Sequence, residues 1–287
     1  MIPSLSSLII VFREAIEAGL IVGIVLAATK GVAQRGLWVG IGIGAGVLGA
    51  CLVAAFAEQI SAQFEGYGQE LFNACVLLLA VGMLTWHNVW MAGHGKQMAR
   101  EMRVLGAAVS TGQRTLTALA IVVGVAVLRE GSEVVLFLYG IAAQGGMTTA
   151  SLLSGGVLGL AGGACVSALM YYGLLSIPAH RLFSVTGWLI TLLAAGMASQ
   201  AVLFLQNGGY LQVLMMPVWD TSWLLPESGD GVLGIIGRML HTLIGYSDQP
   251  NGAQLIAYIA TIAGINVLMR VVNRAKPLPA AVPSPAE

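Results

Sequence analysis

The chain has 287 residues, of which 57% are hydrophobic and only 9% are charged, and its formal net charge is zero. A soluble domain carries about 25% charged residues, so this composition cannot cover a water-exposed surface. It excludes a soluble enzyme or a basic protein that binds nucleic acid, and no nucleic-acid partner is expected. We therefore expect an all-α integral membrane protein in contact with the lipid bilayer.

Seven apolar segments are long enough to cross a bilayer, which takes about 20 mainly apolar residues in a helix. They are residues 5–28, 37–57, 70–91, 115–140, 150–172, 183–205 and 254–272. The first segment follows no basic region, so we expect a membrane helix there and not a cleaved signal peptide. Residues 1–272 are predicted to form one domain, and the Pro/Ala-rich residues 273–287 a disordered tail.

The basic residues predict the orientation of these helices. Of the 13 Lys and Arg residues, ten lie in connections on one side, whereas the opposite side has only Arg238. Because basic connections stay in the cytoplasm, we expect the N-terminus outside and the C-terminus in the cytoplasm. Seven of the 13 acidic residues lie on the outer side. They would suit a surface that gathers cations, although ordinary solvated loop charge accounts for them equally well.

Short sequences recur along the chain at nearly constant spacing. GACLVA begins at Gly49 and GACVSA at Gly163, and LAVGM begins at Leu79 and LAAGM at Leu193. We therefore expect residues 5–91 and 115–205 to be two copies of a three-helix unit, followed by the added helix 254–272. An odd number of spans in each copy gives inverted repeats, which place a substrate site near the membrane midplane.

Each copy carries the motif Arg-Glu-x-x-Glu within an apolar helix. Its residues are Arg13, Glu14 and Glu17 in the first copy and Arg129, Glu130 and Glu133 in the second. A charge at the bilayer centre costs about 2.5–3.5 kcal/mol even on the lenient insertion scale, so these residues cannot face lipid. Ion pairs that hold the helices together are one interpretation. However, two arginines balance only two of the four glutamates, and the other two need protons or a cation.

The carboxylates predict the class of that cation. Carboxylate oxygens suit hard ions such as Mg²⁺, Ca²⁺, Mn²⁺ or ferric iron, and no cluster of Cys or His indicates a softer metal.

The chain also resembles a known family. The features that carry the resemblance are the doubled motif, QELFNACVLLLAVGMLTWHNVWM at 69–91, WDTSWLLPE at 219–227 and IGYSDQP at 244–250. Over residues 5–272 the chain resembles the oxidase-dependent high-affinity iron permeases of fungi and their bacterial homologues. The resemblance implies iron transport across the inner (plasma) membrane along Glu14, Glu17, Glu130 and Glu133. It also implies that Arg13 and Arg129 set the charge and orientation of these glutamates.

The resemblance further implies the substrate and the partners. Iron, as Fe³⁺ or Fe²⁺, would be cargo, and a separate periplasmic or extracellular iron-binding or oxidase protein would deliver it. No redox cofactor and no enzymatic activity are expected in this chain, and homo-oligomer formation is left open. Two alternatives remain at this point. One is a permease for another hard divalent metal or a proton-linked cation. The other is an intramembrane diiron-carboxylate enzyme, which the lack of Glu-x-x-His disfavours.

Weaker signals mark the two ends of a transport path. Glu70, and less strongly Glu58 and Glu65, are candidates for iron uptake at the outer side. His87, Met91 and His94 are candidates for release at the cytoplasmic end of the third span. The simpler interpretations are a favourable charge at a helix N-terminus for Glu70, and interfacial or packing roles for the others.

Overall fold

The computed structural model describes residues 3–62, 69–144, 148–173, 179–227 and 231–274. Over these residues the regular secondary structure is helical, apart from one isolated antiparallel bridge between Pro217 and Asn251. The helices are α1 Leu5–Ala28, α2 Arg35–Ala62, α3 Gln69–Ser110, α4 Leu116–Ala143, α5 Thr149–Tyr171, α6 Ala179–Asn207, α7 Val232–Ile244 and α8 Gly252–Arg274. The all-α prediction is confirmed for the described part of the chain.

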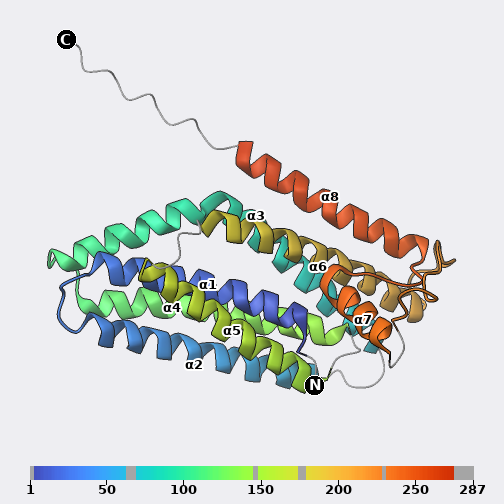
Figure 1. Ribbon diagram of the computed structural model, residues 1–287, viewed down its shortest axis with the longest axis horizontal. Helices are drawn as coiled ribbons and strands as arrows, with labels where there is room; N and C mark the ends of the chain where they lie inside the picture. Colours follow the sequence, from blue (N-terminus) through green and yellow to red (C-terminus); the bar gives the residue numbers. More distant parts are fainter. Residues whose placement is uncertain (1–2, 63–68, 145–147, 174–178, 228–230, 275–287) are drawn as a thin grey trace, which may run out of the picture.

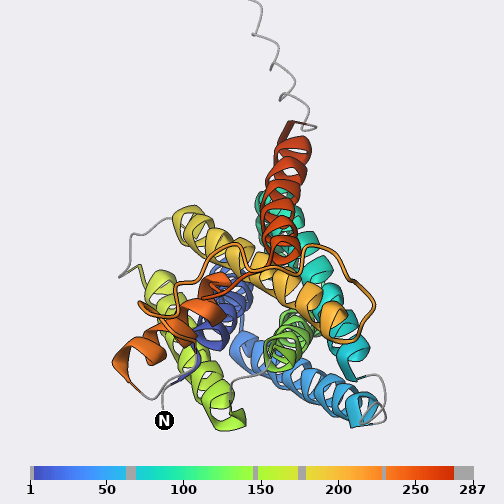
Figure 2. The same cartoon turned by 90° about the vertical axis from the view of Figure 1, so that its right-hand side faces the viewer.

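The long helices run back and forth along one axis of the molecule (Figure 1). The beginning of α1, the end of α6 and the beginning of α8 lie at one end, together with α7. The connections α1–α2 and α3–α4 lie at the opposite end. In the view along the bundle, α1 and α4 occupy the interior, and α8 stands at an edge against α3 and α6 (Figure 2).

Five helical segments are long and apolar enough to cross a membrane. They are Arg35–Ala57, Gln69–Met91, Thr149–Tyr171, Phe183–Asn207 and Gly252–Val272. These segments indicate an integral membrane protein. Helices α1 and α4 have 24 and 28 residues, and each contains the three charges of one motif.

Two connections differ from the sequence prediction. The basic connection expected at 92–114 is largely helix, because α3 continues without a break to Ser110. Its last turns bury Val109 in an apolar cluster with Val25 of α1 and Leu119 of α4, and this packing extends the helix beyond the apolar span. The expected connection at 206–253 contains α7, whose 13 residues are too few to span a bilayer.

Glycines let the helices pack closely. Helix α1 packs along α5, α2 along α4, and α3 along α6. A Cβ on Gly42 of α2 would lie 2.6 Å from the carbonyl oxygen of Ala120, and one on Gly163 of α5 would lie 2.7 Å from that of Phe12. Side chains at these positions would push the helix pairs apart, which is the usual role of small residues in membrane helices.

Candidate metal centre

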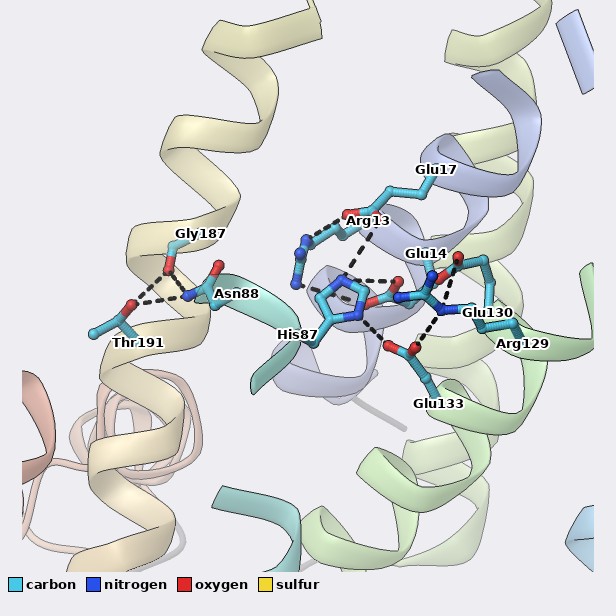
Figure 3. A network of polar contacts seen from close by, with 10 residues as sticks. All are labelled: Arg13, Glu14, Glu17, His87, Asn88, Arg129, Glu130, Glu133, Gly187 and Thr191. Carbon is cyan, nitrogen blue, oxygen red and sulfur yellow. Dashed lines mark hydrogen bonds and ion pairs between the residues drawn. The ribbon is translucent and has the colours of Figure 1, made fainter. Parts of the chain in front are cut away.

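The charged residues of both motifs meet in the middle of the bundle, together with a histidine from a third helix. Figure 3 shows Arg13, Glu14 and Glu17 of α1 facing Arg129, Glu130 and Glu133 of α4, with His87 of α3 between them. Five of these side chains are buried, while those of Glu133 and Arg129 are 13% and 33% exposed. The cluster lies between two apolar clusters, one around Ile10 and Phe137 and the other around Val25 and Leu119.

The two motifs use their arginines in the same way. Arg13 Nε lies 2.9 Å from Glu17 Oε1, and Arg129 Nε donates a hydrogen bond of 3.1 Å to Glu133 Oε1. Residues four apart lie on one face of a helix, so each arginine holds the second glutamate of its own motif.

The first glutamate of each motif is held less closely. Glu14 Oε1 lies 3.6 Å from Arg13, and Glu130 Oε1 lies 4.0 Å from Arg129. Among the described residues, both carboxylate oxygens of Glu14 and Glu17 and the Oε2 atoms of Glu130 and Glu133 are buried without a hydrogen-bond partner. A buried carboxylate without partners is costly, so these oxygens are the natural ligands for a cation.

His87 joins the two motifs. Its Nδ1 contacts the carboxylate of Glu133, while its Nε2 lies 3.5 Å from Glu17 Oε2 and 3.8 Å from Glu14 Oε2. One ligand atom each from Glu14, His87, Glu130 and Glu133 can be chosen so that all lie within 4.8 Å of one another. The described part of the chain therefore contains a compact group of oxygen and nitrogen atoms suited to one metal ion.

The position of His87 differs from the one expected from sequence. We expected it at the cytoplasmic end of a span that ends near residue 91, whereas α3 extends to Ser110 and His87 lies at the level of the motifs. The neighbouring Asn88 is also buried. It donates hydrogen bonds to Gly187 O at 3.0 Å and to Thr191 Oγ1 at 3.1 Å on α6 (Figure 3). The sequence analysis missed this role of His87, and the signal that could have indicated it is two adjacent polar residues in an apolar helix.

A cavity of about 290 Å³ reaches the site from the side of α3 and α4. It is lined by Leu78, Leu79, Gly82, Met83, Trp86, His87 and Glu133. Beside Glu133, the guanidinium of Arg129 lies 4.2 Å from the ring centroid of Trp90, a cation–π contact that covers part of this charge.

The other predicted path residues lie apart from the cluster. Glu70 stands in the first turn of α3, half-buried, with one carboxylate oxygen inaccessible and lacking a hydrogen-bond partner among the described residues. At about 1.5 Å of rise per residue it lies some 25 Å along the helix from His87. Met91 is half-buried one turn beyond His87. The side chains of Glu58 and His94, and the whole of Glu65, lie outside the described residues.

A second group of charges orders the segment between α6 and α8. Glu227 Oε1 lies 3.4 Å from His241 Nδ1 and accepts a hydrogen bond of 2.9 Å from the backbone of Asp248. Burial alone would raise the pKa of Glu227, but the hydrogen bond and charge of His241 lower it below its ordinary value. Burial opposes the charged form of His241 as well, yet the contact with Glu227 raises the pKa of this imidazole. The pair therefore acts as a structural ion pair.

Comparisons with known proteins identify the family of the chain. A family model described as the Iron permease FTR1 family matches residues 4–275. Ferrous iron permease EfeU of Escherichia coli O157:H7 is 29% identical over 259 residues, which cover 87% of this chain and 89% of the relative. Ferrous iron permease EfeU of Yersinia pestis is 27% identical over 254 residues, 87% of each chain. No solved structure matches. The family resemblance predicted from the doubled motif is confirmed, and the chain belongs to the FTR1 family of iron permeases.

Proposed function

We propose that the protein transports iron across the inner (plasma) membrane through a site formed by Glu14, Glu17, Glu130 and Glu133. The observation that carries the proposal is the convergence of two glutamates from each motif in a buried centre that has only two arginines to balance them. With all four carboxylates ionised, the two motifs together have a charge of −2 before His87 is counted. A bound cation neutralises this excess negative charge, so no further basic side chain is needed.

The transport path requires a membrane topology, for which we propose seven spans: α1 to α6 and α8. Helices α1 and α4 have the length of a span, and their charges face each other in the interior. The contacts between helices support inverted repeats. In such repeats α1 corresponds to α4, α2 to α5 and α3 to α6. When each helix is replaced by its counterpart, α1–α5 becomes α4–α2 and α3–α6 becomes itself, so the observed set of packed pairs is unchanged. The pseudo-twofold axis then passes between the two motifs, where a transporter of this plan binds its substrate.

Iron would enter at the end of the bundle that carries α7 and Glu70, and leave at the end that carries the α1–α2 connection. A separate iron-binding protein on the outer side would supply it. The names of the relatives specify ferrous iron, and we propose Fe²⁺ as the ion carried here. Release toward the cytoplasm past Met91 and His94 remains part of this proposal.

Uptake of radioactive iron tests the proposed function. The experiment uses cells without their own iron uptake system that produce either this chain or its variants Glu14→Gln and Glu130→Gln. We expect each variant to reduce uptake at least about tenfold, since each removes a ligand charge. Glu101→Gln is the matched control, because Glu101 is exposed on α3 and hydrogen-bonded only locally to Gln97. Wild-type uptake by both site variants would refute the proposal, and an excess of Mn²⁺ or Mg²⁺ that blocks uptake would indicate another cargo.

A further inference from the structure

We propose that His87 is a nitrogen ligand of the transported ion and makes the site selective for Fe²⁺ over the harder cations Mg²⁺, Ca²⁺ and Mn²⁺. The inference rests on the proposed function, since it assigns a fifth residue to the glutamate site and names the chemistry of its substrate.

The first argument is the placement of His87. Its side chain is 2% exposed, it comes from a third helix, and it points between the two motif helices (Figure 3). The Nε2 atom lies 3.5 Å from Glu17 and 3.8 Å from Glu14, beyond the usual hydrogen-bond range of about 2.7–3.2 Å. This edge of the ring is therefore surrounded by carboxylates but closely bonded to none of them.

Those separations match atoms that share a metal ion. Two ligands at about 2.0–2.2 Å from one first-row metal stand about 3–4 Å apart at ordinary coordination angles. The 3.8 Å between Nε2 and Glu14 Oε2 falls in this range. Glu130, whose Oε2 has no hydrogen-bond partner among the described residues, belongs to the same compact group and supplies a ligand from the second motif.

The second argument is how the ring is held. Nδ1 contacts Glu133, Glu133 accepts the hydrogen bond from Arg129, and Arg129 lies over the ring of Trp90. The imidazole also meets Phe137 edge-on, at 86° and 6.4 Å between ring centroids. Metal-binding histidines commonly have the opposite nitrogen held by a carboxylate, which fixes the ring and aims the free nitrogen at the metal. Glu133 has this position here.

The third argument is ligand chemistry. Carboxylates alone suit Mg²⁺, Ca²⁺ and Mn²⁺, whereas an imidazole nitrogen favours iron and the later divalent metals. The sequence indicated only oxygen ligands, so it predicted a site for hard cations. Adding His87 to Glu14 and Glu130 gives a mixed site in which Fe²⁺ gains more than Mg²⁺ or Ca²⁺, the abundant competitors.

The test uses the purified full-length protein in liposomes, loaded with Fe²⁺ under reducing conditions. We expect His87→Asn to retain transport of a divalent ion but to lower the ratio of Fe²⁺ to Mn²⁺ transport at least about tenfold. His241→Asn is the matched control, because His241 belongs to the segment between α6 and α8, and its ratio should equal that of the wild type. A residue that only supports packing would reduce both rates together and leave the ratio unchanged.

X-ray absorption of the Fe²⁺-loaded wild-type protein provides a direct second measurement that needs no variant to fold. We expect the scattering pattern of a coordinated imidazole, and its loss in His87→Asn. If Glu14→Gln abolishes transport while the wild type shows oxygen ligands only, the assignment of His87 is overturned and the proposed function stands. If Glu14→Gln and Glu130→Gln both transport iron normally, the proposed function itself fails.

Discussion

Glu14 and Glu130 occupy the same position in the two motifs, and neither is held closely by its neighbouring arginine. Their oxygens lie 3.6 Å and 4.0 Å from the guanidinium groups, whereas Glu17 and Glu133 are held at 2.9 Å and 3.1 Å. Each motif thus has one glutamate that lies close to its arginine and one that lies farther from it. This difference leads to separate expectations for binding and for stability.

Substitution of Glu14 should affect metal binding more than folding. We expect Glu14→Gln to weaken Fe²⁺ binding by about ten- to a hundredfold, because it removes a ligand charge while keeping the shape of the side chain. Thermal unfolding in detergent should change little, since no close ion pair is broken. Calorimetric titration of the purified protein with Fe²⁺ measures the first effect. An unchanged affinity would show that Glu14 is not a ligand.

Substitution of Arg13 should show the opposite pattern. The side chain of Arg13 is 3% exposed, and Arg13→Met leaves Glu17 buried without its partner, a loss of about 3–5 kcal/mol. Arg129→Met is the matched comparison, because the side chain of Arg129 is 33% exposed and rests on Trp90. We expect a clearly lower unfolding temperature for Arg13→Met than for Arg129→Met. Equal effects would contradict the structural difference between the two arginines.

Alanine at Gly42 should separate α2 from α4. The added Cβ would lie 2.6 Å from the Ala120 carbonyl oxygen and 3.1 Å from Val123, and such overpacking costs about 1–3 kcal/mol. A Cβ added to Gly44, two residues later, would have no atom within 4 Å, so Gly44→Ala is the control. Unfolding in increasing denaturant measures both. The packing of α2 on α4 would be wrong if Gly44→Ala were the more damaging change.

The pair of Glu227 and His241 should make the segment between α6 and α8 depend on pH. The raised pKa of His241 adds stability to the folded segment. This stability is fully present below the ordinary pKa of 6.5 and is lost as the pH rises through the pKa that His241 has in the folded protein. The lowered pKa of Glu227 adds stability that is complete above its ordinary value of 4.5 and disappears as the pH falls through the folded value. The segment should therefore be best protected from hydrogen exchange between pH 4.5 and pH 6.5.

Hydrogen exchange of residues 231–248, corrected for intrinsic rates, measures this protection from about pH 4 to about pH 9, roughly 2.5 units on either side of the ordinary pKa of histidine. In the wild type we expect protection to decline on both sides of the optimum. His241→Gln should remove the decline on the alkaline side, because the glutamine has no charge to lose. A decline that persists in His241→Gln would assign it to another group.

Local sequence predicts much of this protein. Hydropathy located the long helices, and the presence of Arg13, Glu14 and Glu17 in an apolar segment predicted a candidate site, because an intramembrane charge is too costly to be incidental. The spacing of Gly49 and Gly163 predicted that the segment has a counterpart in a second copy. The first two features depend on residues that are near each other in the chain, and the third depends on a pattern that recurs along it.

The contacts across helices could not be read in the same way. Hydropathy ends the third span near Met91, whereas packing of Val109 against α1 and α4 extends α3 to Ser110 and places His87 among the glutamates. The choice of Gly42 and not Gly44 as the contact with α4 likewise depends on how α2 is rotated. Rotation and axial shift of one helix against another come from the sum of many side-chain contacts, which the periodicity of a single helix does not contain.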